Sequence, residues 1–112
     1  MTEDKKLKEI IDKIFQVIIP DKIILFGSRA RGDAKKDSDY DLLIIKSGIK
    51  NERKIAQDIH VNLIGVDESV DIIVKTPENV EKSLNRFMSI TKQAIKEGII
   101  VYERPFRMVE NS

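Results

Sequence analysis

The sequence contains no cysteine and no tryptophan, and it has a single histidine among its 112 residues. Without cysteine, the chain can form no disulfide bond and has no thiolate that could bind a metal ion. The one histidine, His60, has no second histidine or cysteine with which it could form a zinc site, and we expect it to be a partly buried helix residue. Disulfide-stabilised folds and cysteine-based metal sites are therefore excluded.

Net charge is also nearly absent, because 20 lysine and arginine residues balance 19 aspartate and glutamate residues. A protein that binds nucleic acid electrostatically usually has a strong basic excess, so we expect no strong nucleic-acid binding. No apolar run is long enough to span a membrane, and the charged start of the chain does not resemble a signal peptide. These absences predict a cytoplasmic protein that does not bind a membrane.

Hydrophobic periodicity predicts one domain over residues 1–104, with alternating helices and strands, and a C-terminal tail at residues 105–112. Helices are expected over residues 4–18 and 51–63, and a short turn or helix is expected from Pro77. A last helix that ends at Gly98 is expected to be lined by Leu84, Phe87, Met88, Thr91, Ala94 and Ile95. The expected strands cover residues 23–26, 39–46, 70–75 and 99–102.

A glycine and a serine, Gly27 and Ser28, come directly after the expected strand at residues 23–26. Gly27 has no Cβ, so a phosphate group can lie against the backbone there. Ser28 is a favourable N-cap, and Arg29 and Arg31 fall in the first turn of the short helix that it would begin. Because the N–H groups at a helix start can bind phosphate oxygens, we predict that these four residues bind the phosphates of a nucleotide.

Two aspartates, Asp39 and Asp41, lie two residues apart in the expected strand at residues 39–46, and ten residues separate Ser28 from Asp39. Side chains two apart on a strand share a face, so both carboxylates point to one side of the sheet. Two like charges at this distance repel each other unless a cation lies between them. Mg²⁺ binds one or two carboxylates together with phosphate oxygens, so we predict that this pair binds Mg²⁺.

A third carboxylate, Asp71, lies at the head of the expected strand at residues 70–75. If that strand pairs beside the strand with the two aspartates, Asp71 can complete the metal site and accept a proton from an attacking hydroxyl group. The alternative is a strand-capping role. Asp67 and Glu68 are rival candidates, but they lie in the polar turn before the strand and are expected to be solvated.

The expected elements predict an α+β fold with one mixed sheet and helices packed largely on one face, because the carboxylate strands need an open edge or face for substrate. Simpler explanations of the motifs remain. Residues 29–31 could form an ordinary solvated basic turn, and residues 31–33 spell a cell-adhesion tripeptide without any sign of secretion. No Gly-Lys-Ser/Thr follows Gly27, which argues against a P-loop. Tyr40 and Tyr102 are expected to be packing residues, although either could contact a base or a partner.

The combined pattern resembles the DNA polymerase β-like nucleotidyltransferase superfamily. The resemblance is carried by Gly27-Ser28, ten further residues and Asp39-x-Asp41, with Ala30-Arg31-Gly32 between them. Within that superfamily the chain resembles the minimal nucleotidyltransferases of bacteria and archaea, from the first helix to the strand at residues 99–103. The resemblance implies the nucleotidyltransferase fold. It also implies that the glycine and serine contact the triphosphate of ATP, that the two aspartates bind Mg²⁺, and that Asp71 is the third carboxylate.

Minimal nucleotidyltransferases are commonly antitoxins of helical HEPN-domain ribonuclease toxins, which they silence by transferring AMP to a toxin tyrosine. The resemblance therefore implies an Mg²⁺-dependent enzyme that acts on such a partner, with which it could form a hetero-oligomer; a homo-oligomer is equally open. A chain of this length leaves little room for an acceptor-binding domain, which also favours an acceptor on another polypeptide. Two alternatives remain: a non-catalytic subunit that neutralises its partner by contact, and nucleotidyl transfer to a small molecule such as an aminoglycoside.

Overall fold

The computed structural model describes residues 4–35, 38–86 and 89–105. In this part of the chain the helices and strands, in order, are α1 (Lys5–Phe15), β1 (Lys22–Phe26), α2 (Ser28–Arg31), β2 (Tyr40–Ile45), α3 (Glu52–Asn62), β3 (Val70–Lys75), α4 (Pro77–Leu84), α5 (Ile90–Glu97) and β4 (Ile99–Glu103). None of these helices is long and apolar enough to cross a membrane. Phe87 and Met88, which were expected in the last helix, and most of the expected tail lie outside the described residues.

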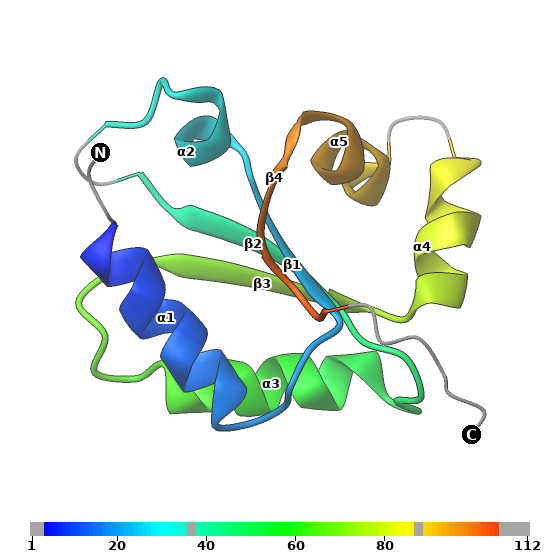
Figure 1. The fold of residues 1–112 in the computed structure, drawn as a ribbon, viewed down its shortest axis with the longest axis horizontal. Helices are drawn as coiled ribbons and strands as arrows, with labels where there is room; N and C mark the ends of the chain where they lie inside the picture. Colours follow the sequence, from blue (N-terminus) through cyan, green and yellow to red (C-terminus); the bar gives the residue numbers. More distant parts are fainter. Residues whose placement is uncertain (1–3, 36–37, 87–88, 106–112) are drawn as a thin grey trace.

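The four strands form one mixed sheet in the order β3-β2-β1-β4, as Figure 1 shows. β1 is antiparallel to both of its neighbours, whereas β2 and β3 are parallel. A parallel pair needs a crossover connection, and α3 provides it here. The predicted α+β fold with a single mixed sheet is confirmed.

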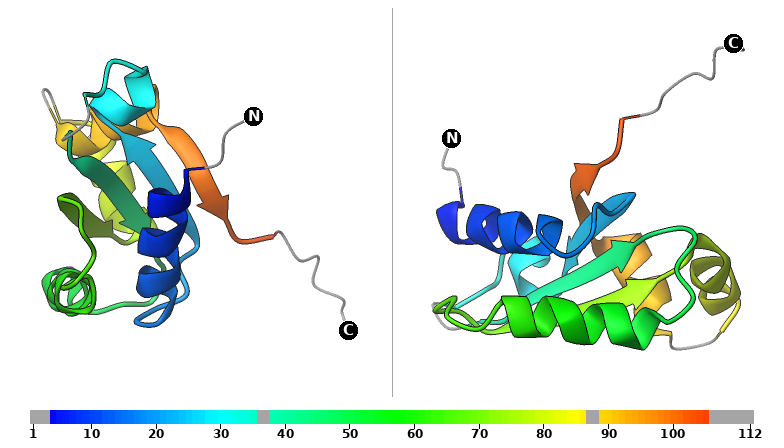
Figure 2. Two further views of the ribbon diagram at one scale, coloured as in Figure 1. Left: turned by 90° about the vertical axis from the view of Figure 1, so that its left-hand side faces the viewer. Right: turned by 90° about the horizontal axis from the view of Figure 1, so that it is seen from below.

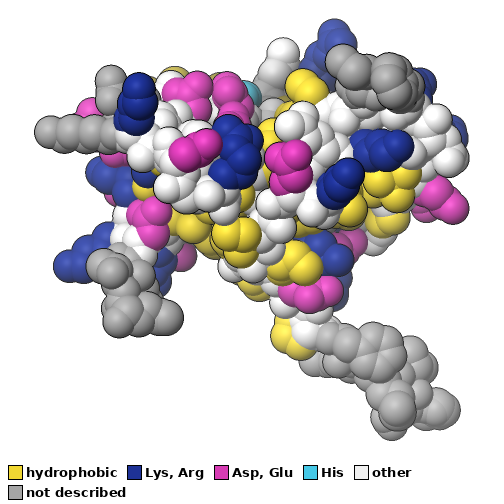
Figure 3. All heavy atoms as spheres, turned by 90° about the horizontal axis from the view of Figure 1, so that it is seen from above, with side chains coloured by type: hydrophobic (Ala, Val, Ile, Leu, Met, Phe, Trp, Pro, Cys, Tyr) yellow, Lys and Arg dark blue, Asp and Glu magenta, His cyan; other side chains and the backbone are white. Residues whose placement is uncertain are grey.

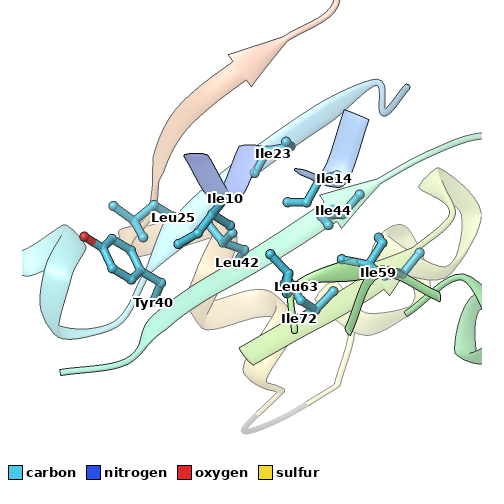
Figure 4. Close-up of a cluster of buried hydrophobic side chains, with 11 residues drawn as sticks. Ile10, Ile14, Ile23, Leu25, Tyr40, Leu42, Ile44, Ile59, Leu63 and Ile72 are labelled. Atoms are coloured by element: carbon cyan, nitrogen blue, oxygen red, sulfur yellow. The ribbon is translucent and has the colours of Figure 1, made fainter. Parts of the chain in front are cut away.

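One face of the sheet carries the larger hydrophobic core, which Figure 4 shows in close-up. Alternate strand residues point into this core because the side chains of a strand alternate between its two faces. The two eleven-residue helices, α1 and α3, cover this face. Its buried residues are Ile10, Ile14, Ile23, Leu25, Tyr40, Leu42, Ile44, Ile59, Leu63, Ile72 and Val74.

The opposite face carries a smaller core, in which Ile24 and Leu43 pack against Ala94 of α5. The expectation of helices largely on one face thus describes α1 and α3, while α5 lies on the other side of the sheet (Figures 1 and 2). This second face also bears Asp41 and Asp71, because Leu42 and Ile72, the next residues on their strands, point into the larger core. Asp71 remains exposed, so this face is open to substrate there.

The last helix begins later than predicted. The short helix expected from Pro77 is present as α4, and it includes Leu84, the first residue that was expected to line the last helix. α4 ends at Leu84, and α5 begins after Ser89, whose hydroxyl accepts a hydrogen bond from the Lys92 N–H at 3.1 Å. Such an N-cap satisfies a backbone donor that an uninterrupted helix would have paired internally. Local capping at Ser89 therefore starts the last helix, α5, at a later residue than the apolar stripe predicted.

His60 is exposed, so the prediction of partial burial is wrong. Its neighbour Ile59 is the fully buried residue of α3. Successive helix residues point about 100° apart, so the histidine is turned away from the core. Tyr40 and Tyr102, by contrast, pack as expected: Tyr40 is buried, and the Tyr102 ring meets Phe15 edge-on with centroids 4.8 Å apart.

The larger core predicts a clear contrast between two truncations. Leu42→Ala should lower the free energy of unfolding by about 2–5 kcal/mol, because Leu42 is fully buried and its loss leaves a cavity. Val61→Ala is the control, since Val61 is 66% exposed and its truncation should change stability by less than about 0.5 kcal/mol. Urea denaturation followed by circular dichroism measures both, and equal losses would contradict this assignment of the core.

Candidate active site

The site is built around the turn from β1 into α2. Gly27 has φ 77° and ψ −157°, a backbone conformation that is essentially restricted to glycine. A Cβ at this position would also collide with Oδ2 of Asp41. Both the backbone conformation and the space beside Asp41 therefore require glycine at position 27. The lack of a side chain lets the backbone approach the Asp41 carboxylate directly.

Ser28 is the first residue of α2 and not its N-cap, which corrects the prediction for this residue; Gly27 occupies the cap position. The Gly27 carbonyl accepts hydrogen bonds from the N–H groups of Ala30 and Arg31 at 3.1 and 3.0 Å. α2 ends at Gly32, whose φ of 86° gives a left-handed C-cap. The predicted glycine-serine turn and short helix are thus present, shifted by one residue.

Asp41 and Asp71 are directly paired across β2 and β3, while Phe26, the last residue of β1, pairs with Asp41 from the other side. Phe26, Asp41 and Asp71 therefore lie side by side across β1, β2 and β3, and Gly27 follows directly after Phe26. The condition placed on the third carboxylate is met, because β3 pairs in parallel beside β2. The two carboxyl groups are close enough to share a hydrogen bond.

Burial is the main cause that raises the pKa of Asp41, followed by the hydrogen bond and the charge of Asp71 and then the charge of Asp39. The positive charge of Arg31 acts in the opposite direction. Asp39 itself is exposed and lies one residue before β2. Within the described ranges, no three histidine, cysteine, aspartate or glutamate side chains are gathered closely enough to hold a metal ion.

The donor set nevertheless suits Mg²⁺. Asp41 and Asp71 are oxygen ligands whose mutual repulsion a cation would relieve, and Mg²⁺ needs only one or two carboxylates beside substrate phosphates and water. Asp39 adds negative charge to the same place, as its effect on the pKa of Asp41 indicates. The structure therefore brings two of the three predicted carboxylates into contact and leaves the third beside them.

The two arginines of α2 have different surroundings. Arg31 is half-exposed and lies 3.4 Å from Asp33 and 3.9 Å from Glu97, and its charge reaches Asp41. Arg29 is mostly buried, and its guanidinium donates from Nε and Nη2 to the Ser38 carbonyl at 3.0 and 2.8 Å. The interpretation of this segment as an ordinary solvated basic turn is therefore wrong for Arg29.

Arg29 has two further neighbours that the sequence did not identify. Its guanidinium lies 4.0 Å from the centroid of the Tyr40 ring and 3.8 Å from a carboxylate oxygen of Glu68. Glu68 is only 25% exposed, so the expectation that it is solvated is wrong, whereas Asp67 is exposed as expected. No local sequence signal predicts these contacts, because they join α2 to β2 and to the segment before β3.

Tyr40 extends this set of contacts to the start of α1. Its hydroxyl donates to both carboxylate oxygens of Asp4, at 3.1 and 3.0 Å, and Asp4 also accepts a hydrogen bond from the Leu7 N–H as the N-cap of α1. Burial, with the bond to Asp4, raises the pKa of Tyr40 to about 12. The first described residue is thereby joined to the strand that carries Asp41.

Figure 3 shows the molecule from above, where acidic and basic side chains alternate with exposed hydrophobic ones.

Comparison with known proteins identifies the family to which this chain belongs. The nucleotidyltransferase domain family matches residues 4–101, and the chain belongs to this family. A curated protein of Methanocaldococcus jannaschii, named as a candidate protein adenylyltransferase, is 31% identical over 105 residues, which cover 91% of this chain and 100% of the relative.

Two solved structures support the same fold. The crystal structure of a candidate nucleotidyltransferase from Sulfolobus solfataricus is similar with a TM-score of 0.62 and 26% identity, covering 89% of this chain and 79% of that one. A chain in a complex of tri-AMPylated Shewanella oneidensis HEPN toxin with an MNT antitoxin has a TM-score of 0.56 at 16% identity, covering 89% and 71%. The second likeness is one of fold. The predicted nucleotidyltransferase fold is confirmed.

The two glycines that flank α2 allow the contact with Asp41 to be tested. Gly32→Ala should cost about 1–2 kcal/mol, because its positive φ disfavours a side chain while nothing lies within 4 Å of the added Cβ. Gly27→Ala should cost about 1–3 kcal/mol more, because its Cβ also meets Asp41. Thermal unfolding of the two variants measures the difference. Equal losses would show that backbone strain alone explains the glycine at position 27.

The carboxylate pair predicts a pH-dependent gain for Asp41→Asn. Because the pKa of Asp41 is raised in the folded protein, stability falls as pH rises from the ordinary carboxyl range through the raised pKa, and it stays lower above that value. Without ligands, Asp41→Asn should therefore have a higher Tm than the wild type at pH 7, and the gain should vanish near about pH 3, below the ordinary aspartate pKa. Exposed Asp67→Asn is the control, and a lower Tm for Asp41→Asn at pH 7 would contradict the repulsion.

Proposed function

We propose that this protein is an Mg²⁺-dependent adenylyltransferase that moves AMP from ATP to a tyrosine hydroxyl of a helical HEPN-domain toxin and thereby acts as its antitoxin in the cytoplasm. The observation that carries the proposal is the Asp41–Asp71 pair placed directly beside Gly27. The proposal is supported by the relative named as a protein adenylyltransferase and by the fold shared with a chain of the AMPylated toxin complex.

Each part of the site has a distinct task in this reaction. Asp41 and Asp71, with Asp39 beside them, would hold Mg²⁺, which when bound neutralises triphosphate charge and stabilises charge that develops at the α-phosphate. The backbone at Gly27 and Ser28 would bind the β- and γ-phosphates. Arg31, whose charge already acts on Asp41, would add positive charge beside the phosphates.

The strand order gives the reaction a direction. Gly27 follows β1, Asp41 lies on the central β2, and Asp71 lies on the edge strand β3. Displacement at phosphorus places the attacking and leaving oxygens in line, so a pyrophosphate held at β1 requires an acceptor that approaches from β3. Exposed Asp71 can accept the hydroxyl proton while the new bond to the α-phosphorus forms and the bond to pyrophosphate breaks.

A second candidate, neutralisation of the partner by contact alone, is favoured by apolar side chains on the surface. Ile99 and Ile100 on the edge strand β4 are 49% and 51% exposed. An exposed apolar edge strand suits association with another polypeptide. Contact and catalysis can coexist, so the decisive question is whether neutralisation requires the carboxylates.

Mass spectrometry of a partner distinguishes the two functions. The test substrate is the product of a neighbouring gene, a small helical protein with an Arg-x4–6-His motif, incubated with this protein, ATP and Mg²⁺. The partner should gain one or more AMP units on tyrosine, and Asp41→Asn should slow this by about 100-fold or more, since it removes a metal ligand.

Asp58→Asn is the matched control, because Asp58 lies on α3 and pairs with Lys54 away from the site. It should transfer AMP at the wild-type rate. If Asp41→Asn without ATP neutralises the partner as well as the wild type does, inhibition is by contact and the catalytic account is wrong. Transfer of AMP to an aminoglycoside but not to the partner would also overturn it.

A further inference from the structure

Arg29 touches the residues on both sides of Asp39. Two of its nitrogens donate to the Ser38 carbonyl, at 3.0 and 2.8 Å, and its guanidinium plane stacks 4.0 Å from the Tyr40 ring centroid. The Arg29 side chain of α2 thus contacts the backbone of the residue before Asp39 and the side chain of the residue after it. We call these two contacts the Arg29 grip.

Both sides of the grip are themselves anchored. The Tyr40 hydroxyl is bonded to Asp4, and the Tyr40 N–H donates to the Ser69 carbonyl at 2.9 Å. Glu68, the residue before Ser69, lies 3.8 Å from the guanidinium and offsets its charge. Two segments that are distant from α2 in the sequence, residues 38–40 and Glu68, therefore contact this one arginine, and Asp4 holds Tyr40 from the other side.

We propose that Arg29 is a positioning residue that fixes the backbone of Asp39 for metal binding, and that it is not a ligand of the triphosphate. Asp39 lies outside β2, so the β-sheet hydrogen bonds do not hold it, and its neighbours must be held in another way. The role in metal binding rests on the proposed function. The grip itself is a property of the protein without nucleotide.

The chemistry of the grip requires arginine. A guanidinium can donate two converging hydrogen bonds to one carbonyl oxygen while its flat face lies over an aromatic ring, whereas a lysine ammonium is a point charge that cannot do both. Arg29→Lys therefore removes the grip but keeps the positive charge. A triphosphate ligand would behave differently, because lysine also binds phosphate and would restore most of the function.

Amide hydrogen exchange tests the grip without ATP, metal or partner. The Tyr40 N–H, which bonds to Ser69, should exchange at least about tenfold faster in both Arg29→Lys and Arg29→Met, as expected for the loss of a hydrogen bond to a charged group. The Lys46 N–H, bonded to the Lys75 carbonyl at the other end of the same strand pair, is the internal control. Equal acceleration at both amides, or none at Tyr40, would overturn the proposal.

Arg104→Met is the matched control variant, since Arg104 also has an ion pair, 3.4 Å from Asp21, at the far end of β1. It should leave exchange of the Tyr40 amide unchanged. Tyr40→Phe removes the bond to Asp4 and keeps the ring under the guanidinium. The backbone amide at position 40 should therefore exchange at an intermediate rate in this variant. Exchange at the wild-type rate would show that the anchoring at Asp4 is unnecessary and would contradict that part of the proposal.

Kinetics then separate positioning from phosphate binding. In both Arg29 variants the Mg²⁺ concentration for half-maximal AMP transfer should rise about 10–100-fold while the KM for ATP changes little. A higher KM for ATP that Arg29→Lys restores would overturn the proposal in favour of a phosphate ligand. If the wild type transfers no AMP, the proposed function fails, and the exchange result still decides whether Arg29 holds the segment around Asp39.

Discussion

The pairing of β2 with β3 is the constraint on which the rest of this structure depends. Their parallel register places Asp41 directly beside Asp71. Burial is the main cause that raises the pKa of Asp41, and the neighbouring Asp71 raises it further. Two carboxyl groups in this position destabilise the protein without a ligand, so other contacts must hold the strands together. The larger core does this, because Leu42 and Ile72, the next residues on the same strands, are buried beneath α1 and α3.

The two faces of the sheet thus have different roles: one carries the larger hydrophobic core, and the other carries the candidate site. One face is covered by two helices and filled with aliphatic side chains, and the other carries the acidic pair at its open end. Around that end the protein uses contacts that hydrophobic burial cannot supply: a glycine with a conformation closed to other residues, and an arginine that grips the segment before β2. The repulsion between the carboxylates is thus concentrated where a bound cation would relieve it.

Much of the fold and site was predictable from local patterns. The period of two along β2 correctly placed Asp41 on the face opposite Tyr40. Gly27 was expected to let a phosphate approach the backbone, and in the structure the group close to it is the Asp41 carboxylate. The predicted start of the last helix near Leu84, the partial burial of His60 and the solvation of Glu68 were wrong. Each error arose where capping, helix rotation or a distant partner outweighed the local apolar pattern.

The sequence by itself determined that Tyr40 and Asp41 point to opposite faces of the sheet, that a turn beginning with glycine follows β1, and that the chain carries the motif of the nucleotidyltransferase family. Those features depend on neighbours in the chain, so periodicity and backbone stereochemistry suffice to predict them. Only the tertiary structure decided that Asp71 lies against Asp41 and that Arg29 reaches Ser38, Tyr40 and Glu68. These contacts depend on strand order and register, which are settled when the whole hydrophobic core packs and not by any one segment.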